Sequence, residues 1–307
     1  MRTRVSEKVE NCIDSLTLSL SEKAKAFREA GEAVVSFGTG EPDFTTPAYI
    51  CDGAKAAIDA GHTKYDAVTG VAALRSVIAR KLKEDNGLSY GMDEIIVNSG
   101  AKSSLSVALQ TILNPGDEVI IPKPYWVSYT EMVKLAGGVP VVVDTDPENA
   151  FKMTAEQMKA AITDKTKAMM LNTPVNPTGV LYSLEELQAL AAVAVEADIL
   201  VISDEIYEEF VYDGNKTVSI ASLGEAIKNN TILVNGFSKT YAMTGWRLGY
   251  AAAPADIIAG MKRIQGHTIS HPSTITQYAG ITALEEKKKK VRWWMRSSVF
   301  LTSAVRL

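Results

Sequence analysis

Short apolar segments alternate along this chain with longer amphipathic segments, and this alternation limits the possible folds more than any other feature. We expect strands at residues 95–97, 118–121, 139–143, 168–171, 199–203, 231–234 and 248–251. Helical segments lie between most of them, for example at residues 102–113, 128–135 and 184–196. Strands this apolar, each separated from the next by a helix, are typical of a sheet covered on both faces. The sequence therefore predicts an α/β protein with a mainly parallel central sheet and helices on both faces.

Composition and charge exclude several other classes of protein. The chain has 307 residues, 46% of them hydrophobic, and a formal net charge of −4, which argues against overall disorder and against nucleic acid as a partner. Two cysteines cannot form a disulfide framework, and the three histidines lack zinc-ligand spacing, so we expect no metal. The most apolar stretch, residues 187–202, is interrupted by Glu196 and Asp198, and the N-terminus lacks a signal-peptide pattern. We expect a cytoplasmic protein with no membrane partner.

Two segments place charged side chains at the ends of expected strands. Lys239 lies in a Gly/Ser turn just past the strand at 231–234, and Arg247 follows eight positions later. A lysine at such a strand end sits where α/β proteins bind ligands, and an arginine can hold a phosphate with two hydrogen bonds. The strand at 199–203 runs into Asp204, a carboxylate that could keep a ring nitrogen protonated.

Two further segments are polar turns that follow strands. Residues 172–179 form the turn Asn-Thr-Pro-Val-Asn-Pro-Thr-Gly, and residues 98–103 lead from a strand into a helix N-terminus, which offers N–H groups to an anion. Each of the four segments has an ordinary explanation when taken alone, such as a solvated lysine, a helix-capping aspartate or a simple turn. Four of them at strand ends in one α/β pattern indicate a ligand site.

Together these motifs resemble those of the fold-type I, pyridoxal-phosphate-dependent aminotransferases of class I, and they are most similar to the prokaryotic aspartate aminotransferases. The resemblance covers residues 5–286, nearly the whole chain. It implies that Lys239 forms a Schiff base with pyridoxal phosphate and later moves a proton between the substrate Cα and the cofactor C4′. It also implies that Asp204 pairs with the pyridinium nitrogen and so keeps the ring an electron sink.

The same resemblance assigns the remaining contacts. Tyr207 and Asn176 would hydrogen-bond the 3-oxygen of the ring, and Trp126 would stack on its face. Tyr65 would reach the phosphate of the neighbouring subunit, which makes a homodimer with shared active sites the expected form. The phosphate would be held by Gly100, Ala101, Lys102, Ser238 and Arg247. The substrate would contact Gly40, Lys102, Trp126 and Asn176.

Substrate choice is less well determined by these residues. Lys102 matches a lysine that this branch is thought to use for the distal carboxylate of aspartate or glutamate, although a solvent-facing lysine at a helix start explains it almost as well. Val175 stands where an asparagine is usual, and His271 stands where a smaller polar residue is common. Both differences lie near the cofactor or the dimer contact and bear on specificity.

The leading hypothesis is an aminotransferase that moves an amino group from aspartate to a 2-oxo acid, 2-oxoglutarate. Two alternatives stay open, namely a β-elimination lyase of the same fold and a truncated chain that binds pyridoxal phosphate with impaired turnover. A nicotinamide-dependent dehydrogenase is disfavoured because no Gly-x-Gly-x-x-Gly turn opens an early βαβ unit.

The resemblance also predicts the domain organisation. Residues 1–46 would belong to an incomplete small domain, residues 47–286 would form the large cofactor-binding domain, and residues 287–307 would be a divergent tail. Family members run further and carry an arginine that holds the substrate α-carboxylate with two hydrogen bonds. The tail starts with four lysines and is interpreted either as a solvated basic helix end or as the product of a shifted reading frame. The second interpretation rests on the unique codons of Trp293-Trp294-Met295, which in the neighbouring frame encode residues suited to a surface helix.

Overall fold

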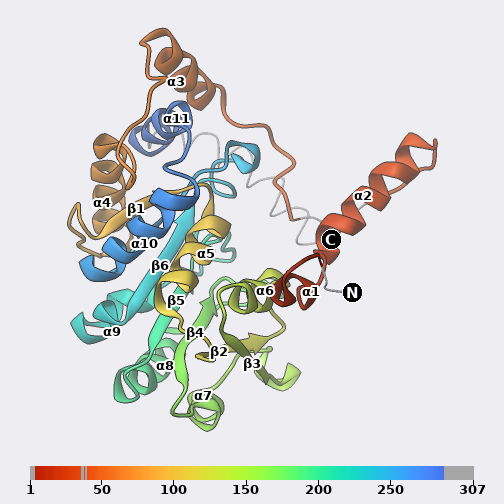
Figure 1. Ribbon diagram of the computed structural model, residues 1–307, viewed down its shortest axis with the longest axis vertical. Helices are drawn as coiled ribbons and strands as arrows, with labels where there is room; N and C mark the ends of the chain where they lie inside the picture. Colours follow the sequence, from red (N-terminus) through yellow and green to blue (C-terminus); the bar gives the residue numbers. More distant parts are fainter. Residues whose placement is uncertain (1–3, 36–37, 39, 287–307) are drawn as a thin grey trace.

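A single sheet organises the fold of this chain, for which a computed structural model describes residues 4–35, 38 and 40–286. The sheet has seven strands in the order β1-β7-β6-β5-β4-β2-β3 (Figure 1). β7 is antiparallel to both of its neighbours, and the other pairings are parallel, so the expected mainly parallel sheet is confirmed. The strands are β1 (Ile95–Asn98), β2 (Glu118–Lys123), β3 (Val139–Asp144), β4 (Thr166–Asn172), β5 (Leu200–Asp204), β6 (Thr231–Gly236) and β7 (Gly249–Ala252).

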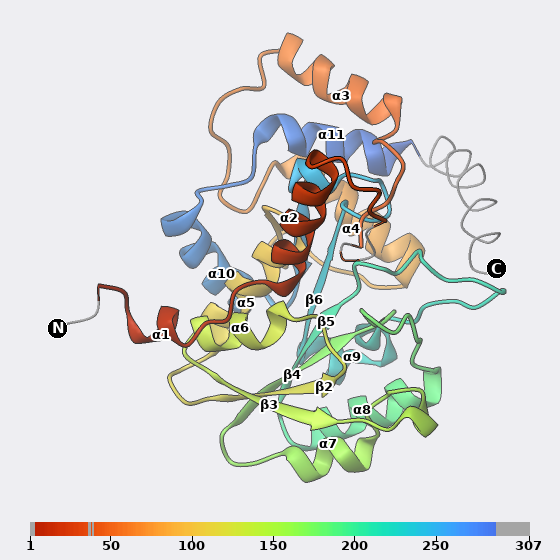
Figure 2. The ribbon, with the colours of Figure 1, turned by 90° about the vertical axis from the view of Figure 1, so that its right-hand side faces the viewer.

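Helices cover both faces because successive strand residues point to opposite sides. In β6, Ile232 and Val234 pack in one cluster with α5 (Ala101–Ile112), α6 (Ser128–Leu135) and α10 (Ala255–Thr268). Leu233 between them packs on the other face. That face is covered by α3 (Ala48–Asp59), α4 (Ala72–Asn86), α7 (Ala155–Ala161), α8 (Leu184–Glu196), α9 (Glu225–Asn229) and α11 (Thr274–Glu285). The two views show α3 and α11 at one end of the molecule and α7 and α8 at the other (Figures 1 and 2). The expected helical layers on both faces are therefore present.

The N-terminal segment runs outside this layered body. It contains α1 (Glu7–Glu10) and α2 (Leu16–Glu29), and α2 extends away from the sheet in Figure 1. The backbone N–H of Ile13 donates to Oε2 of Glu131 on α6 at 2.9 Å. Further along, the hydroxyl of Thr46 donates to the carbonyl of Ala242 at 2.6 Å, and the indole N–H of Trp246 donates to the Thr46 hydroxyl at 2.9 Å. The two bonds of Thr46 hold the end of this segment against the turn that follows β6.

Three short 3₁₀ turns complete the described elements, η1 (Pro147–Asn149), η2 (Ile220–Leu223) and η3 (Thr244–Trp246). Within the described part of the chain, every helix is too short or too polar to cross a lipid bilayer.

Candidate active site

Strand direction gathers the predicted site residues at one edge of the sheet. The parallel strands all end there, so this carboxyl edge receives Asp204 at the end of β5 and Lys239 shortly after β6. Gly100 follows β1 at the same edge. β7 runs in the opposite sense, so its beginning lies at this edge and places Arg247 there as well. This is the position at which open α/β sheets bind their ligands.

Asp204 is a deeply buried carboxyl at this edge, with 3% of its surface exposed. Its Oδ2 accepts a hydrogen bond of 2.7 Å from the hydroxyl of Tyr129, and its Oδ1 accepts one of 3.2 Å from the N–H of Ile206. Burial raises the pKa of this carboxyl to about 6, although both hydrogen bonds and the charge of Lys239 act in the opposite direction. A buried carboxylate of this kind stabilises a cation placed next to it.

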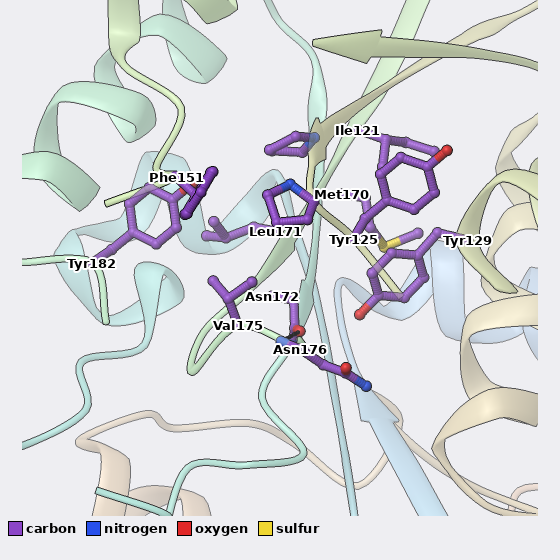
Figure 3. Close-up of a pocket in the computed structure, with 12 residues that line it drawn as sticks. Ile121, Tyr125, Tyr129, Phe151, Met170, Leu171, Asn172, Val175, Asn176 and Tyr182 are labelled. Carbon is purple, nitrogen blue, oxygen red and sulfur yellow. Dashed lines mark hydrogen bonds between the residues drawn. The ribbon is translucent and has the colours of Figure 1, made fainter. Parts of the chain in front are cut away.

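Tyr129 is a site residue that the sequence analysis missed. It lies in the first turn of α6, is almost completely buried, and packs its ring edge-on against Trp126 with the ring centroids 5.5 Å apart. Its hydroxyl, visible in Figure 3, reaches across from the helix layer to Asp204. A tyrosine at this spacing in an amphipathic helix is indistinguishable from a core residue, so the sequence carried no signal for its role.

The amine of Lys239 lies among polar groups from three segments. Its Nζ donates to the carbonyl of Gly40 and lies 5.7 Å from the ring centroid of Tyr207. Burial lowers its pKa; the positive charge of Arg247 also lowers it, whereas the charges of Glu41 and Asp204 raise it. The net effect increases the fraction of neutral amine, the form that can attack a carbonyl group or accept a proton.

Asn176 and Tyr207, both predicted to contact the ring oxygen of the cofactor, lie next to each other at this edge. Nδ2 of Asn176 lies 3.5 Å from the Tyr207 hydroxyl, and the backbone N–H of Asn176 donates to Oδ1 of Asn172 at 2.7 Å. Asn172 in turn donates to the carbonyl of Asp204 at 2.8 Å, so the turn after β4 is tied to the end of β5. Burial raises the pKa of Tyr207 to about 12, which keeps its hydroxyl protonated and able to donate at neutral pH.

The turn from β1 into α5 forms an anion cradle. Gly100 caps the helix with a φ of 87°, and a Cβ added there would lie 2.6 Å from Nη2 of Arg247. A Cβ added to Gly249 would lie 2.5 Å from the backbone nitrogen of Ala101. Two glycines thus allow the arginine, the helix N-terminus and β7 to approach closely. The N–H groups of the first turn of α5 and the guanidinium of Arg247 are donors suited to a phosphate or another anion.

Lys102 and Trp126 form a second contact beside this cradle. Nζ of Lys102 lies 4.6 Å from the ring centroid of Trp126, a cation–π arrangement. Burial lowers the pKa of the Lys102 amine, and the charge of Arg247 adds to the effect. The lysine amine therefore lies over the indole ring while the residue as a whole stays exposed, so its role at the site stays a prediction.

Of the other predicted residues, Gly40 and Ser238 join the edge and Tyr65 does not. The carbonyl of Gly40 accepts a hydrogen bond from the Lys239 amine. Ser238, which precedes Lys239 in the sequence, is buried. Tyr65 lies on the loop between α3 and α4 with 90% of its surface exposed, and its ring contacts that of His271 edge-on at 5.7 Å. The loop also borders a surface cavity lined by His62, Lys64, His271 and Thr274.

A small cavity adjoins the edge beside β2 and β4, and Tyr129 and Asn176 are among the residues that line it. Figure 3 shows Tyr125 and Tyr129 on one side of it and Phe151 and Tyr182 on the other. It measures about 20 Å³, room for about one water molecule, so it does not accommodate a substrate. Its relevance lies in its position beside the Tyr129 hydroxyl.

The residues at this edge fit pyridoxal phosphate. The cradle at Gly100, Gly249 and Arg247 offers donors and close approach to a phosphate, and the buried Asp204 offers a counter-charge to a protonated ring nitrogen. Lys239 supplies an amine whose pKa is lowered, and the indole of Trp126 supplies a flat face. These four features are the ones that the chemistry of this cofactor requires of a protein.

Comparison with known proteins identifies the family. The family model described as aminotransferase class I and II matches residues 32–302, and the chain belongs to this family of pyridoxal-phosphate-dependent transferases, which act on small amino and oxo acids. The chain is therefore an aminotransferase. The match continues past residue 287 into the tail, which lies outside the described residues. Both interpretations of the tail, a solvated basic helix end and the product of a shifted reading frame, therefore stay predictions.

Individual relatives are closely similar. An aspartate aminotransferase of Geobacillus stearothermophilus is 49% identical over 288 residues, which cover 94% of this chain and 73% of the relative. One of Bacillus subtilis is 50% identical over 91% of this chain and 71% of the relative. The solved structure of the aspartate aminotransferase from Thermus thermophilus with maleate superposes with a TM-score of 0.92 at 42% identity, over 97% of this chain and 76% of that one.

Proposed function

We propose that this chain binds pyridoxal phosphate at the carboxyl edge of the sheet and moves an amino group between aspartate and 2-oxoglutarate. The observation that carries the proposal is the convergence of a lysine amine of lowered pKa with a buried aspartate that a tyrosine hydroxyl holds in place. Both lie beside the anion cradle formed by Gly100 and Arg247.

The bound cofactor supplies an aldehyde and a ring that withdraws electrons from the substrate Cα. Lys239 would hold the cofactor through its Nζ at the aldehyde, a condensation that releases water, and once freed the same Nζ would hold and return the proton of the substrate Cα. Its lowered pKa suits both steps, since each needs the neutral amine near neutral pH. The carbonyl of Gly40 and the ring of Tyr207 keep the amine at the edge before the cofactor arrives.

Asp204 stabilises the protonated ring nitrogen through charge. Burial raises its pKa to about 6, and a positively charged ring beside it would lower this pKa and hold the group in the carboxylate form. Tyr129 and the N–H of Ile206 fix the orientation of the carboxylate. Asn176 and Tyr207 supply an amide and a hydroxyl for the ring oxygen, and Gly100, Ala101, Lys102, Ser238 and Arg247 supply the phosphate contacts.

Two observations support a dicarboxylic substrate. The relatives at 49–50% identity are named aspartate aminotransferases, and Lys102 is held over Trp126 at the edge of the site with its amine available to a second carboxylate. Other relatives are named aspartate/prephenate aminotransferases. Prephenate, like 2-oxoglutarate, is a 2-oxo acid with a second carboxylate, so the relatives' names favour an acceptor of this kind.

We further propose that the active form is a homodimer and that residues 47–286 form the cofactor-binding domain. The exposed ring of Tyr65, far more exposed than a tyrosine usually is, is available to a second copy of the chain. In that arrangement Tyr65 would donate to the phosphate in the neighbouring subunit, and residues 1–46 would belong to the small domain.

The decisive experiment is an absorbance spectrum of the purified protein with pyridoxal phosphate, before and after an excess of aspartate. We expect a visible band that depends on Lys239, moves to shorter wavelength with aspartate, and returns with 2-oxoglutarate. A band that no amino acid changes would instead identify a chain that binds the cofactor without turnover. Release of pyruvate from a cystathionine-like substrate would identify a β-elimination lyase, and the absence of any band would overturn the proposal.

A further inference from the structure

A wholly buried glutamine, Gln265, lies on the sheet-facing side of α10 and contacts Asn98, the last residue of β1. None of its surface is exposed. Its Oε1 accepts a hydrogen bond of 2.6 Å from Nδ2 of Asn98, and its Nε2 donates to the carbonyls of Val68 at 2.6 Å and Val97 at 2.9 Å. Both N–H groups and the amide oxygen are therefore in use, and the side chain is fixed in one orientation.

Asn98 passes this constraint to the anion cradle. It is the last residue of β1, and its Oδ1 accepts a hydrogen bond of 2.8 Å from the hydroxyl of Ser104 in the first turn of α5. Its own carbonyl accepts from the N–H of Gly100 at 2.8 Å. The chain of bonds from Gln265 through Asn98 to Ser104 thus braces the turn that presents the N–H groups of α5.

One of the other hydrogen bonds of Gln265 reaches the segment that follows Tyr65. The carbonyl of Val68 accepts from Gln265, and the carbonyl of Thr69 accepts from the N–H of Val97 at 3.0 Å. A second wholly buried glutamine, Gln277 of α11, accepts from the N–H of Val71 at 2.7 Å. Two glutamines therefore hold residues 68–71, but only Gln265 also contacts the cradle.

We propose that Gln265 is a positioning residue for the phosphate of the cofactor, acting through Asn98 on the turn at residues 98–101. The inference rests on the proposed function, because it assumes that this turn binds the cofactor phosphate. Only a primary amide can accept once and donate twice at this place. Leucine would remove the hydrogen-bond partner that Gln265 gives to Nδ2 of Asn98 and to two buried backbone carbonyls, and glutamate would place a carboxylate against those carbonyls.

The test compares binding of pyridoxal phosphate with binding of pyridoxal, which lacks the phosphate. The dissociation constant of pyridoxal divided by that of pyridoxal phosphate, both measured by titration of the visible absorbance, isolates the contribution of the phosphate site. For Gln265→Leu we expect this ratio to fall about tenfold, with pyridoxal itself bound within about threefold of the wild-type affinity. Ser104→Ala, a milder change at the far end of the same chain of bonds, should lower the ratio in the same direction.

Gln277→Leu is the matched control, because Gln277 is equally buried and bonds the same segment without contacting Asn98. It should lower the melting temperature of the cofactor-free protein as Gln265→Leu does, yet leave the ratio unchanged. A ratio that stays at the wild-type value in both Gln265→Leu and Ser104→Ala would overturn the inference alone. If Gln265→Leu fails to fold, the ratio for Ser104→Ala decides. A wild-type protein that binds neither compound would overturn the proposed function and this inference with it.

Discussion

The hydroxyl of Tyr129 donates a hydrogen bond of 2.7 Å to Oδ2 of Asp204 and thereby joins the first turn of α6 to the end of β5. Both groups are buried, so the bond lies where water competes little and where an unpaired carboxylate oxygen is costly. Among the described residues, Tyr129 is the side chain that donates a hydrogen bond to the Asp204 carboxylate, whose other donor is the backbone N–H of Ile206.

Removal of the Tyr129 hydroxyl should weaken Asp204 as a counter-charge. In Tyr129→Phe the pKa of Asp204 should rise further above about 6, because burial remains and one stabilising hydrogen bond is lost. We expect kcat to fall about tenfold at pH 7 and the loss to grow at lower pH, measured as a pH profile of the transaminase half-reaction. Tyr182→Phe removes another buried hydroxyl, one that accepts from Met153, and should leave the profile as in the wild type. Equal effects of the two substitutions would contradict the assigned role.

Glu205, the residue after Asp204, should make the cofactor-free protein less stable as the pH rises. It points to the opposite face of the sheet, where the hydroxyls of Ser203 and Ser219 donate to its Oε1 at 2.9 and 2.6 Å. Burial raises its pKa from 4.5 to about 7. Because the folded state holds the proton to a higher pH than the unfolded chain does, its contribution to stability is complete below about pH 4.5 and is lost as the pH rises through about 7.

Glu205→Gln should remove this pH dependence. Relative to the wild type, the free energy of unfolding of the variant should increase between pH 4.5 and 8 by up to about 3 kcal/mol, measured by urea denaturation. Glu148→Gln, which removes an exposed carboxylate, controls for the change in net charge. Parallel stability curves for wild type and Glu205→Gln would show that the carboxyl is already ionised in the folded protein at low pH.

A methyl group at Gly249 should disrupt the anion cradle. Its Cβ would lie 2.5 Å from the nitrogen of Ala101, a contact that forces α5 and β7 apart. We expect Gly249→Ala to lose about 1–3 kcal/mol of stability and to bind pyridoxal phosphate more weakly than the wild type. Gly245→Ala adds the same methyl group where nothing lies within 4 Å, and it should retain both properties. The measurements are thermal unfolding and titration with the cofactor.

Lys102 should determine the preference for a substrate with a second carboxylate. Lys102→Met keeps a long apolar chain over Trp126 and removes the charge. We expect kcat/KM for aspartate to fall at least about tenfold while that for alanine changes little, because only aspartate loses a charged partner. Lys123→Met, which removes an exposed lysine paired with Asp144, is the control. A uniform loss for both substrates would assign Lys102 to the phosphate alone.

Much of this arrangement was predictable because it follows from strand order. The alternation of apolar strands and helices predicted the sheet, and the polar residues at strand ends predicted that Asp204, Asn176 and Lys239 would share an edge. The contacts across layers were not predictable in the same way. Tyr129 in α6 looks like a core tyrosine, and its bond to Asp204 exists only because the helix packs over the end of β5.

Gln265 could have been found from the sequence. It continues the buried stripe of α10 formed by Ile258 and Met261, so a polar side chain stands where helical periodicity demands an apolar one. Such a residue needs buried partners, but the sequence does not say that these are Asn98 and two backbone carbonyls on distant segments. The role of Tyr65 was predicted from the resemblance alone. Its ring is exposed, and its contact with a second chain stays a prediction.

The reversed direction of β7 has a consequence for the evolution of the site. Gly236 pairs with Gly249, and the N–H of Phe237 donates to the carbonyl of Leu248 at 3.1 Å, so the chain between them is a loop closed at its base. This loop carries both Lys239 and Arg247. Insertions and deletions inside it would change the spacing between the amine and the guanidinium, whereas those in the exposed loop near Asp213 and Gly214 would not. The length of the loop should therefore be among the least variable dimensions of the protein.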